Sequence, residues 1–431
     1  MNIESLVISS PKRTRSAYRG WEGYFPYYAG YPLSFADQLI QSAGLSPHAR
    51  VFDPWNGSGT TTFAASDAGV EALGLDLNPV MVVVARARGL PFTEADALLP
   101  IIQRLLVRIQ DAQPAISEDD PLLTWYTAET ASEIRGIEQA VRELLIGPYT
   151  LNGGNPRIDL MSAVAATFYV ALFSSVRSAS ARFRTTNPTW TKRPRDKKSR
   201  LTFEPGLLSS IFSVAVENMA FALHDRRTLL RRASAPADVV QADCATYSVE
   251  PESADLILTS PPYCTRIDYV SATRIELAIL SPLAAAAEAD LKMAMLGSTC
   301  APANVGEPLE AWGGSCLRFL EKVQAHSSKA SATYYYRNHV DYYSKLYKSL
   351  SNVSKALTGD GIAVMVVQDS HYKEIHNPVP TILSEMLSQC GLSLVRRENY
   401  HLERTMAARH RFRSKYRQDA SAIESVLCFS R

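Results

Sequence analysis

The chain has 431 residues, of which 46% are hydrophobic and 20% are charged. These proportions are typical of a globular protein and exclude a fibrous or disordered chain. The formal net charge of +2 neither favours nor excludes a polyanionic partner until the distribution of charge along the chain is considered.

The first clear pattern along the chain is a strand, a glycine-rich turn, a helix and a second strand. Residues 49–53 predict the first strand, residues 54–59 the turn, and residues 61–68 the helix. The second strand covers residues 71–76, ends in Asp76 and is followed by a helix-like run at 79–88. This βαβ order predicts an α/β fold with a doubly wound, mostly parallel sheet.

Helical periodicity then replaces the strand pattern between residues 91 and 235. Apolar residues recur at helical spacing in four segments, at 98–109, 128–145, 159–177 and 207–230. Strands are expected again at 238–242, 255–259, 361–367, 393–397 and 422–429. Residues 281–333 form a second inserted stretch, with an alanine-rich helix followed by loops. We predict one α/β domain, made of residues 1–90 and 236–431, interrupted by a mostly helical insertion at 91–235.

Cysteine usage and the N-terminal residues bear on the cellular compartment. The six cysteines are scattered, without CxxC spacing or a Cys/His cluster, so we expect reduced thiols and no metal site. The first residues contain no signal-peptide core. The most apolar stretch, residues 160–176, is short for a membrane span and contains several serines, which favours a buried helix. We expect a cytoplasmic protein without a membrane segment.

The glycine-rich turn runs from Asp53 to Thr61, with the sequence DPWNGSGTT. Gly57 and Gly59 allow a tight turn and a close approach of the backbone to a ligand. The third glycine of a dinucleotide fingerprint is absent, because Thr62 stands there, and no phosphate-binding GK[ST] follows. The turn therefore suits a nucleoside-type cofactor such as S-adenosylmethionine. Asp76 could accept hydrogen bonds from ribose hydroxyls; a purely structural turn beside a surface carboxylate is the alternative.

A second motif follows the apolar strand at 255–259, which ends in Thr259-Ser260-Pro261-Pro262-Tyr263. Two prolines donate no hydrogen bonds and hold the backbone extended. Their carbonyls and the Ser260 hydroxyl are expected to remain as acceptors at the carboxyl edge of the sheet, where ligands bind in this architecture. Acceptors beside an aromatic ring suit a planar substrate with an exocyclic amine. The alternative is a rigid strand-to-loop turn with a buried tyrosine.

Together the two motifs resemble those of the amino-group DNA methyltransferases, which methylate N4 of cytosine or N6 of adenine. The segment from Tyr31 to Phe35 is similar to the one that those enzymes place over the methionine end of the cofactor. Asp243 resembles their acidic contact to the cofactor's adenine, and residues 423–429 resemble their last, antiparallel strand. The resemblance covers roughly residues 17–90 and 236–430. It implies a Rossmann-like methyltransferase sheet that binds S-adenosyl-L-methionine, with residues 91–235 as the DNA-recognition region.

The resemblance also implies site residues. Catalysis is expected from Ser260, Pro261, Pro262 and Tyr263. Cofactor contacts are expected from Tyr31, Pro32, Phe35, Asp53, Trp55, Gly57, Ser58, Gly59, Thr60, Asp76 and Asp243. Trp55 departs from the family pattern, where phenylalanine is usual, but keeps an aromatic ring.

In that family, serine at the first position of the tetrapeptide usually accompanies cytosine N4, and aspartate accompanies adenine N6. Ser260 therefore favours an enzyme that flips a cytosine out of duplex DNA and methylates its N4 amine. Adenine N6 and an RNA amine remain alternatives within the same chemistry. A catalytically silent nucleic-acid-binding module is the alternative of another class, and a nicotinamide oxidoreductase is disfavoured by the missing glycine. A cognate restriction or defence nuclease is a possible partner, and the chain could be a monomer or a dimer.

Charge is strongly segregated along the chain. Residues 177–232 contain 13 basic and 4 acidic residues, and residues 396–417 contain 8 and 2, whereas residues 51–150 contain 6 and 14. Basic residues interleaved with aromatics suit phosphate contact and base readout; a solvated loop or helix face is the alternative. Candidate DNA contacts are Arg182, Arg184, Trp190, Lys192, Arg193, Arg195, Lys197, Lys198, Arg409, Arg411, Arg413 and Lys415.

Three further features have a plain structural explanation beside a functional one: a basic run, a group of tyrosines and a cysteine. Lys12 and Arg13 belong to a basic run that could be a mobile DNA-binding arm or a disordered tail. A group of tyrosines could form a stacking platform, but its helical spacing with Leu346 and Leu350 favours core packing; the group is Tyr334, Tyr335, Tyr336, Tyr342 and Tyr343. Cys264 follows the tetrapeptide directly, but no nearby base is evident in the sequence, so we expect a core thiol.

Overall fold

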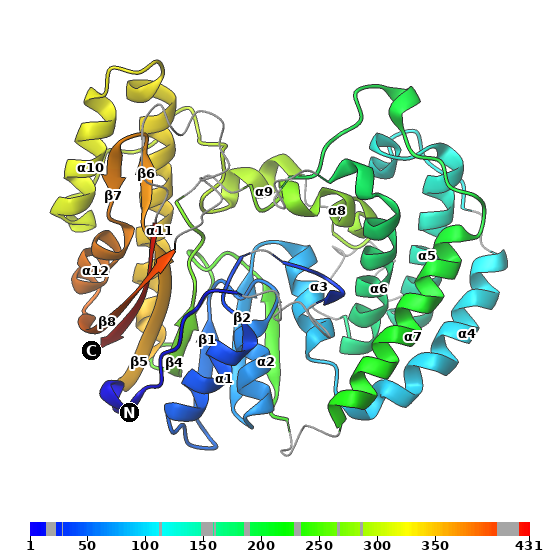
Figure 1. The fold of residues 1–431 in the computed structure, drawn as a ribbon, viewed down its shortest axis with the longest axis horizontal. Coiled ribbons are helices and arrows are strands. Elements are labelled where there is room, and N and C mark those ends of the chain that lie inside the picture. Colours follow the sequence, from blue (N-terminus) through cyan, green and yellow to red (C-terminus); the bar gives the residue numbers. More distant parts are fainter. Residues whose placement is uncertain are drawn as a thin grey trace.

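The computed structural model describes residues 1–13, 23–27, 29–111, 114–147, 158, 161–184, 190–227, 234–264, 268–284, 288–402 and 422–431. Its centre is a seven-stranded sheet in the order β3-β2-β1-β4-β5-β9-β8 (Figure 1). The strands are β1 (Arg50–Asp53), β2 (Glu71–Asp76), β3 (Ala237–Gln241), β4 (Ala254–Thr259), β5 (Leu357–Gln368), β8 (Ser393–Leu402) and β9 (Ala422–Ser430).

The direction of the strands confirms the predicted doubly wound, Rossmann-like sheet. Strands β1 to β5 pair in parallel, whereas β9 is antiparallel to both of its neighbours, β5 and β8. The antiparallel strand is therefore the last along the chain, as expected, but it lies inside the sheet. The winding reverses between β1 and β4, because β2 and β3 extend to one side and β5 to the other. In open α/β sheets, ligands bind at the carboxyl ends of the strands beside such a reversal.

Side chains on the central strands alternate between two apolar cores, as the period-2 geometry of a strand requires. On β4, Leu256 and Leu258 pack into one core and Ile257 into the other. The first core lies under α1 (Leu33–Ser42) and α2 (Thr60–Asp67). The second lies under α10 (Gly314–Ala325), α11 (Tyr336–Ala356) and α12 (Val379–Gln389). Helices thus cover both faces and leave the carboxyl edge for function.

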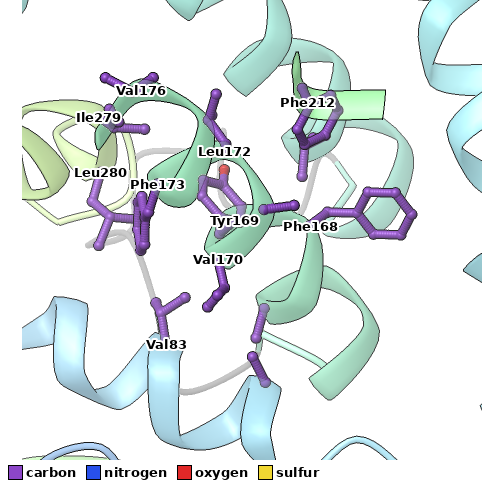
Figure 2. Packing of buried hydrophobic residues seen from close by; sticks show 14 of the residues in the cluster. Val83, Phe168, Tyr169, Val170, Leu172, Phe173, Val176, Phe212, Ile279 and Leu280 are labelled. Atoms are coloured by element: carbon purple, nitrogen blue, oxygen red, sulfur yellow. The ribbon is translucent and has the colours of Figure 1, made fainter. Parts of the chain in front are cut away.

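The region between β2 and β3 is helical, as predicted. It contains α4 (Ala95–Asp111), α5 (Ala128–Leu145), α6 (Ala163–Ala179) and α7 (Leu207–Arg227), which follow α3 (Pro79–Arg88). Figure 2 shows that α6 is the centre of this region: Val170 points toward Val83 of α3, and Phe173 lies near Leu280 of α8 (Arg274–Leu280). These helices therefore share one core with α3 and α8, whereas the predicted division into domains stays a prediction.

Two apolar helices in this region could suggest a membrane. The stretch predicted to be a buried helix is confirmed, because most of α6 lies inside the core. In α7, the segment Leu207–His224 has a mean hydropathy of 1.4 and is long enough to cross a membrane, with 33% of it buried. Since α7 packs beside α4 and α6, this is weak evidence for a span.

The sequence prediction was wrong within residues 281–333. The part expected to be loop contains α10, which begins at Gly314 with Gly313 as its N-cap and buries Phe319, Leu320 and Val323 against the sheet. The two glycines suggest a loop, but the apolar residues that follow recur at helical spacing. A short hairpin of β6 (Ser370–Tyr372) and β7 (Ile375–Asn377) was also not predicted.

Candidate active site

The predicted acceptor motif lies where β4 ends, beside the point at which the sheet reverses its winding. The Ser260 hydroxyl donates a hydrogen bond to the carbonyl oxygen of Val366 on β5, at 3.0 Å. Its one donor is therefore used inside the protein, and its remaining lone pairs can accept. Ser260 is half-buried, so these lone pairs are not sealed in the core. The structure gives Ser260 the hydrogen-bonding character of an acceptor.

The two proline carbonyls differ from each other. The Pro262 carbonyl accepts a hydrogen bond from the Tyr342 hydroxyl of α11 at 2.9 Å, so the expectation that both carbonyls remain unused was wrong for Pro262. The Pro261 carbonyl accepts none from the part of the chain that the structure describes. The motif therefore has two acceptors with unused lone pairs, the half-buried Ser260 hydroxyl and the carbonyl of Pro261, which is a buried residue.

Tyr263 is held at both of its ends. Its backbone N–H donates to the hydroxyl of Tyr269 at 3.2 Å, and its own hydroxyl donates to Oε1 of Glu424 at 2.7 Å. Gly297 approaches the Tyr263 carbonyl so closely that an added Cβ would lie 3.0 Å from it. Glu424 was not among the predicted site residues, because 161 positions separate it from Tyr263. Only the antiparallel direction of β9 brings the two together.

The glycine-rich turn is fixed by backbone conformation and by Asp76. Gly57 and Gly59 have φ of +50° and +77°, the region that favours glycine, and Gly59 is the N-cap of α2. The N–H of Gly57 donates to Oδ2 of Asp76 at 3.0 Å, and the N–H of Asn78 donates to Oδ1 at 2.7 Å. Desolvation by burial raises the pKa of Asp76 to about 7. Asp76 thus ties the turn to the end of β2 and is still partly exposed.

Asp53 joins three elements beneath the turn. Its carboxylate accepts hydrogen bonds from the hydroxyls of Thr61 and Thr259, both at 2.5 Å, and from the N–H of Trp55 at 3.1 Å. The hydroxyl of Tyr31 lies 2.5 Å from that of Thr61 and extends this network toward α1. Burial raises the pKa of Asp53 to about 6. Asp53 therefore connects β1, α2 and β4, and its direct contact with a cofactor stays a prediction.

The predicted cofactor residues fall into two groups by exposure. Half-buried residues face the carboxyl edge; they are Trp55, Gly57, Asp76 and Asp243. Buried residues lie behind them; they are Tyr31, Pro32, Phe35, Asp53, Ser58, Gly59 and Thr60. Asp243 accepts a hydrogen bond from the N–H of Ala245 at 2.9 Å, in the turn that follows β3. The first group is the more accessible of the two.

The first basic segment, residues 181–201, is described except for residues 185–189. Six of its predicted DNA contacts are exposed cations without an ion pair among the described residues; they are Arg182, Arg184, Lys192, Arg195, Lys197 and Lys198. The backbone of this segment is anchored, because the N–H of Thr191 donates to the carbonyl of Ser271 at 3.2 Å. Ser271 begins the short 3-10 helix Ser271–Thr273 that follows the tetrapeptide in the chain. The backbone of the segment is therefore anchored to this part of the chain, and its cations are exposed, although Arg184 also donates to the carbonyl of Arg177 at 2.8 Å.

Arg193 and Trp190 are engaged by other side chains of the protein. Arg193 pairs with Glu288 at 2.7 Å, and Glu288 also accepts from Arg274 and Lys292, each at 2.7 Å. Burial alone would raise the pKa of Glu288, but the hydrogen bonds from Lys292 and Arg274 lower it to about 2. The guanidinium of Arg274 lies 4.9 Å from the ring centre of Trp190, which is 42% exposed. These two predicted contacts already have partners in the protein.

Other predicted basic residues divide between the described and undescribed parts of the chain. Arg409, Arg411, Arg413 and Lys415 lie outside the described residues. Arg13 lies inside them and donates to the carbonyls of Tyr27 at 2.9 Å and Tyr31 at 3.1 Å. The interpretation of this residue as part of a mobile arm or disordered tail was therefore wrong: its guanidinium satisfies two backbone acceptors beside the site.

Cys264 has a possible base beside it, contrary to expectation. Its Sγ lies 3.5 Å from Nδ1 of His339 on α11. Burial nevertheless raises the pKa of the Cys264 thiol to about 12, so the thiol stays protonated and the interpretation as a core thiol holds. The core packing predicted for the tyrosines is confirmed for Tyr342 and Tyr343, which are buried, whereas Tyr334, Tyr335 and Tyr336 are only half-buried. No cluster of metal-ligating side chains occurs within the described ranges.

Comparisons with known proteins give the family context. No protein-family model matches the chain. It is 23% identical over 298 residues to the Type II methyltransferase M.AvaI of Nostoc sp. and of Anabaena variabilis, and 22% identical over 269 residues to the Type II methyltransferase M.BsoBI of Geobacillus stearothermophilus. The matches cover 64% and 59% of this chain but only 56% and 51% of those relatives. The chain is thus related to Type II methyltransferases and spans about half their length.

Among solved structures, the chain is similar to the rRNA methyltransferase aviRa from Streptomyces viridochromogenes. The match has 11% identity and covers 93% of this chain and 87% of that chain, with a TM-score of 0.27. A TM-score this low supports no argument about shared architecture, so the assignment of the fold rests on the order and direction of the strands.

Proposed function

We propose that the chain is an S-adenosyl-L-methionine-dependent DNA methyltransferase that modifies the N4 amine of cytosine in a specific duplex sequence. The proposal rests mainly on one observation, which is that the two motifs lie at the same edge of the sheet. The turn from Asp53 to Gly59 ends β1, and the acceptors Ser260 and Pro261 follow β4, its neighbour in the sheet. The relationship to Type II methyltransferases supports the same chemistry.

The residues of the turn suit this cofactor. The positive φ angles of Gly57 and Gly59 allow a ligand to approach the backbone, and no phosphate-binding lysine follows the turn. The partly exposed carboxylate of Asp76 has lone pairs left for ribose hydroxyls, because each oxygen accepts only one backbone N–H. Asp243 follows β3 and would accept from the amino group of the adenine. When bound, the cofactor supplies the methyl group on a sulfonium.

The acceptor pair suits an exocyclic amine. The N4 amine of cytosine is conjugated with the ring and is poorly nucleophilic. Two hydrogen bonds, from its N–H groups to Ser260 Oγ and to the Pro261 carbonyl, would favour a pyramidal nitrogen and direct its lone pair toward the methyl group. Because the Ser260 hydroxyl already donates to Val366, its orientation is set before the substrate binds. Positioning of this kind removes much of the entropic barrier to a bimolecular reaction.

Tyr263 would hold the flipped base. A base within a duplex is inaccessible, and extruding it costs a few kcal/mol. Stacking on an aromatic side chain returns about 1–3 kcal/mol. Duplex DNA would be held by the exposed cations of residues 181–201, a segment whose backbone is anchored to Ser271. The second basic segment, with Arg409 to Lys415, would contribute further phosphate contacts.

The test is methylation of a long, unmethylated duplex DNA that contains many short sequences. The purified chain is incubated with this DNA and the methyl donor, and the nucleosides are identified by mass spectrometry. N4-methylcytosine is the expected product. N6-methyladenine alone would overturn the choice of base, and methylation of RNA alone would overturn the choice of polymer. Binding of nucleic acid without any cofactor binding would favour the catalytically silent module.

The proposed function carries further expectations. A modified short sequence is protected from a matching endonuclease, so we propose a role in restriction–modification or defence, with a cognate nuclease as a partner and a cytoplasmic location. Residues 1–90 and 236–431 would form the catalytic domain, and residues 91–235 would contribute to DNA recognition. Restriction mapping of DNA from cells that express the chain would identify the protected sequence.

A further inference from the structure

Glu424 is an unusual residue in its strand. Along β9, the side chains that face the same side, Val426 and Cys428, are apolar and fully buried. Glu424 is only 8% exposed, and its carboxylate accepts one side-chain hydrogen bond from the described residues, from Tyr263. Burying a carboxylate costs several kcal/mol unless partners compensate. An apolar side chain at position 424 would make the sheet more stable. The presence of a carboxylate there therefore suggests a functional role.

The direction of β9 explains how Glu424 reaches the site. Because β9 is antiparallel, its first residues lie at the edge where the parallel strands end, and Glu424 pairs with Gln368, the last residue of β5. Tyr263 follows β4, on the other side of β5. Neighbouring strands lie about 4.8 Å apart, so β4 and β9 are separated by roughly 10 Å. The phenol of Tyr263 and its hydrogen bond to Glu424 therefore cross the end of β5.

The contact between Tyr263 and Glu424 does not depend on the charge of the carboxyl group. The groups that act on its carboxyl are the Tyr263 hydroxyl and Lys12 of the N-terminal segment, and both favour the ionised form. Burial acts in the opposite direction and raises the pKa of Glu424 above its ordinary value. The hydroxyl of Tyr263 can donate to the carboxyl group in either state, since an oxygen with a free lone pair remains in both. The bond is therefore a fixed attachment rather than a pH-dependent one.

We infer that Glu424 is a positioning residue that fixes the ring of Tyr263 in the orientation needed to stack on the extruded base. This inference rests on the proposed function. Tyr269 holds the backbone of Tyr263, and Glu424 holds the opposite end of the side chain, so the phenol keeps its orientation without a bound substrate. Glu424 touches neither the base nor the cofactor in this role and acts only through Tyr263.

Four variants test the inference in the full chain, with the long duplex DNA as substrate. Glu424→Leu removes the acceptor, and Tyr263→Phe removes the donor while keeping the ring. Each is expected to lower kcat/KM for DNA roughly tenfold without changing cofactor affinity. Glu424→Gln keeps an acceptor oxygen and is expected to stay within about twofold of the unmodified chain. Glu398→Leu on β8, which faces Val426 across the strand pair, is the matched control and should leave activity unchanged.

The double variant separates positioning from simple stabilisation. If the hydrogen bond is the whole effect, Tyr263→Phe combined with Glu424→Leu loses no more activity than either change alone. If the activity losses of the two single variants multiply in the double variant, or if Tyr263→Phe keeps full activity, the inference is wrong. Should Glu424→Leu fail to fold, Tyr263→Phe and Glu424→Gln still decide the question. An unmodified chain that methylates no nucleic acid would instead overturn the proposed function, which is a different result from active but insensitive variants.

Discussion

The tetrapeptide Ser260–Tyr263 and the basic segment at residues 181–201 differ in how the protein holds their side chains. The tetrapeptide is held by Val366, Tyr342, Tyr269 and Glu424, which come from β5, α11, the following loop and β9. In the basic segment the protein holds mainly the backbone, through Ser271, and leaves cations such as Lys197 exposed. One region has fixed side chains, and the other has available charges.

The difference follows from what each region has to do under the proposed function. Methyl transfer depends on the position of an amine to within a fraction of an ångström, so its acceptors must be immobile before substrate arrives. Phosphate neutralisation depends on the number of cations near the backbone and tolerates long flexible side chains. Arg193 and Trp190 depart from this division, because Glu288 and Arg274 already engage them.

Tyr263→Ala should have the largest effect, because it removes the stacking surface from the fixed region. The loss of 1–3 kcal/mol of stacking corresponds to a decrease of about 5- to 150-fold in kcat/KM. Cofactor affinity, measured by calorimetry, should stay the same. Trp190→Ala is the comparison in the other region and should change DNA affinity more than kcat. If Tyr263→Ala and Trp190→Ala had equally small effects on kcat/KM, the proposed difference between the tetrapeptide and the basic segment would be contradicted.

Gly59→Ala tests the rigidity of the turn beside the tetrapeptide. A Cβ at this position would lie 2.7 Å from the Cβ and 2.9 Å from the Cα of Ala85, at a φ of +77°. Backbone strain and overpacking should together cost about 2–4 kcal/mol, visible as a lower Tm and weaker cofactor binding. Gly359→Ala meets no atom within 4 Å and is the control. An unchanged Tm for Gly59→Ala would show that the turn adapts.

Cofactor affinity should increase with pH, because the ionised carboxylate of Asp76 is the form that accepts ribose hydroxyls. Burial raises the pKa of Asp76 to about 7, so the ionised fraction grows between pH 6 and pH 8. Affinity scales with this fraction and should rise about tenfold over that range. Asp76→Asn should abolish the dependence in the same calorimetric titration. Affinity that falls with pH would mean that Asp76 does not bind the cofactor in its charged form.

The smallest effect should come from the exposed cations. Replacing Lys197 and Lys198 by alanine should make the dependence of log affinity on log salt shallower by roughly 2 and leave kcat unchanged. Arg193→Ala should change the slope less, because the guanidinium of Arg193 is held by its ion pair with Glu288. Fluorescence anisotropy with labelled duplex DNA at several salt concentrations measures both. If the unmodified chain and both variants showed the same slope, residues 181–201 would not belong to the DNA interface.

Local sequence patterns predict the elements better than the partners. The bounds of β2, α3 and α5 are those expected from periodicity, and the two motifs meet at one edge because parallel strands end together. The partners of the tetrapeptide were not predictable, since Tyr342 lies 80 residues and Glu424 lies 161 residues from the residues they bind. No local pattern distinguishes Glu424 from a surface carboxylate. The same reason explains why the pairing of Arg193 with Glu288 was missed.

The long connection between β2 and β3 has a consequence for how the chain is made. In the sheet β3 pairs directly with β2, yet Asp76 and Ala237 are separated by the whole helical region. Pairings between distant segments slow folding. At 5–20 residues per second, a ribosome needs on the order of 10 s to deliver β3 after β2. Until then the outer edge of β2 is unpaired, so early helix packing around α6 should shelter the nascent chain from aggregation.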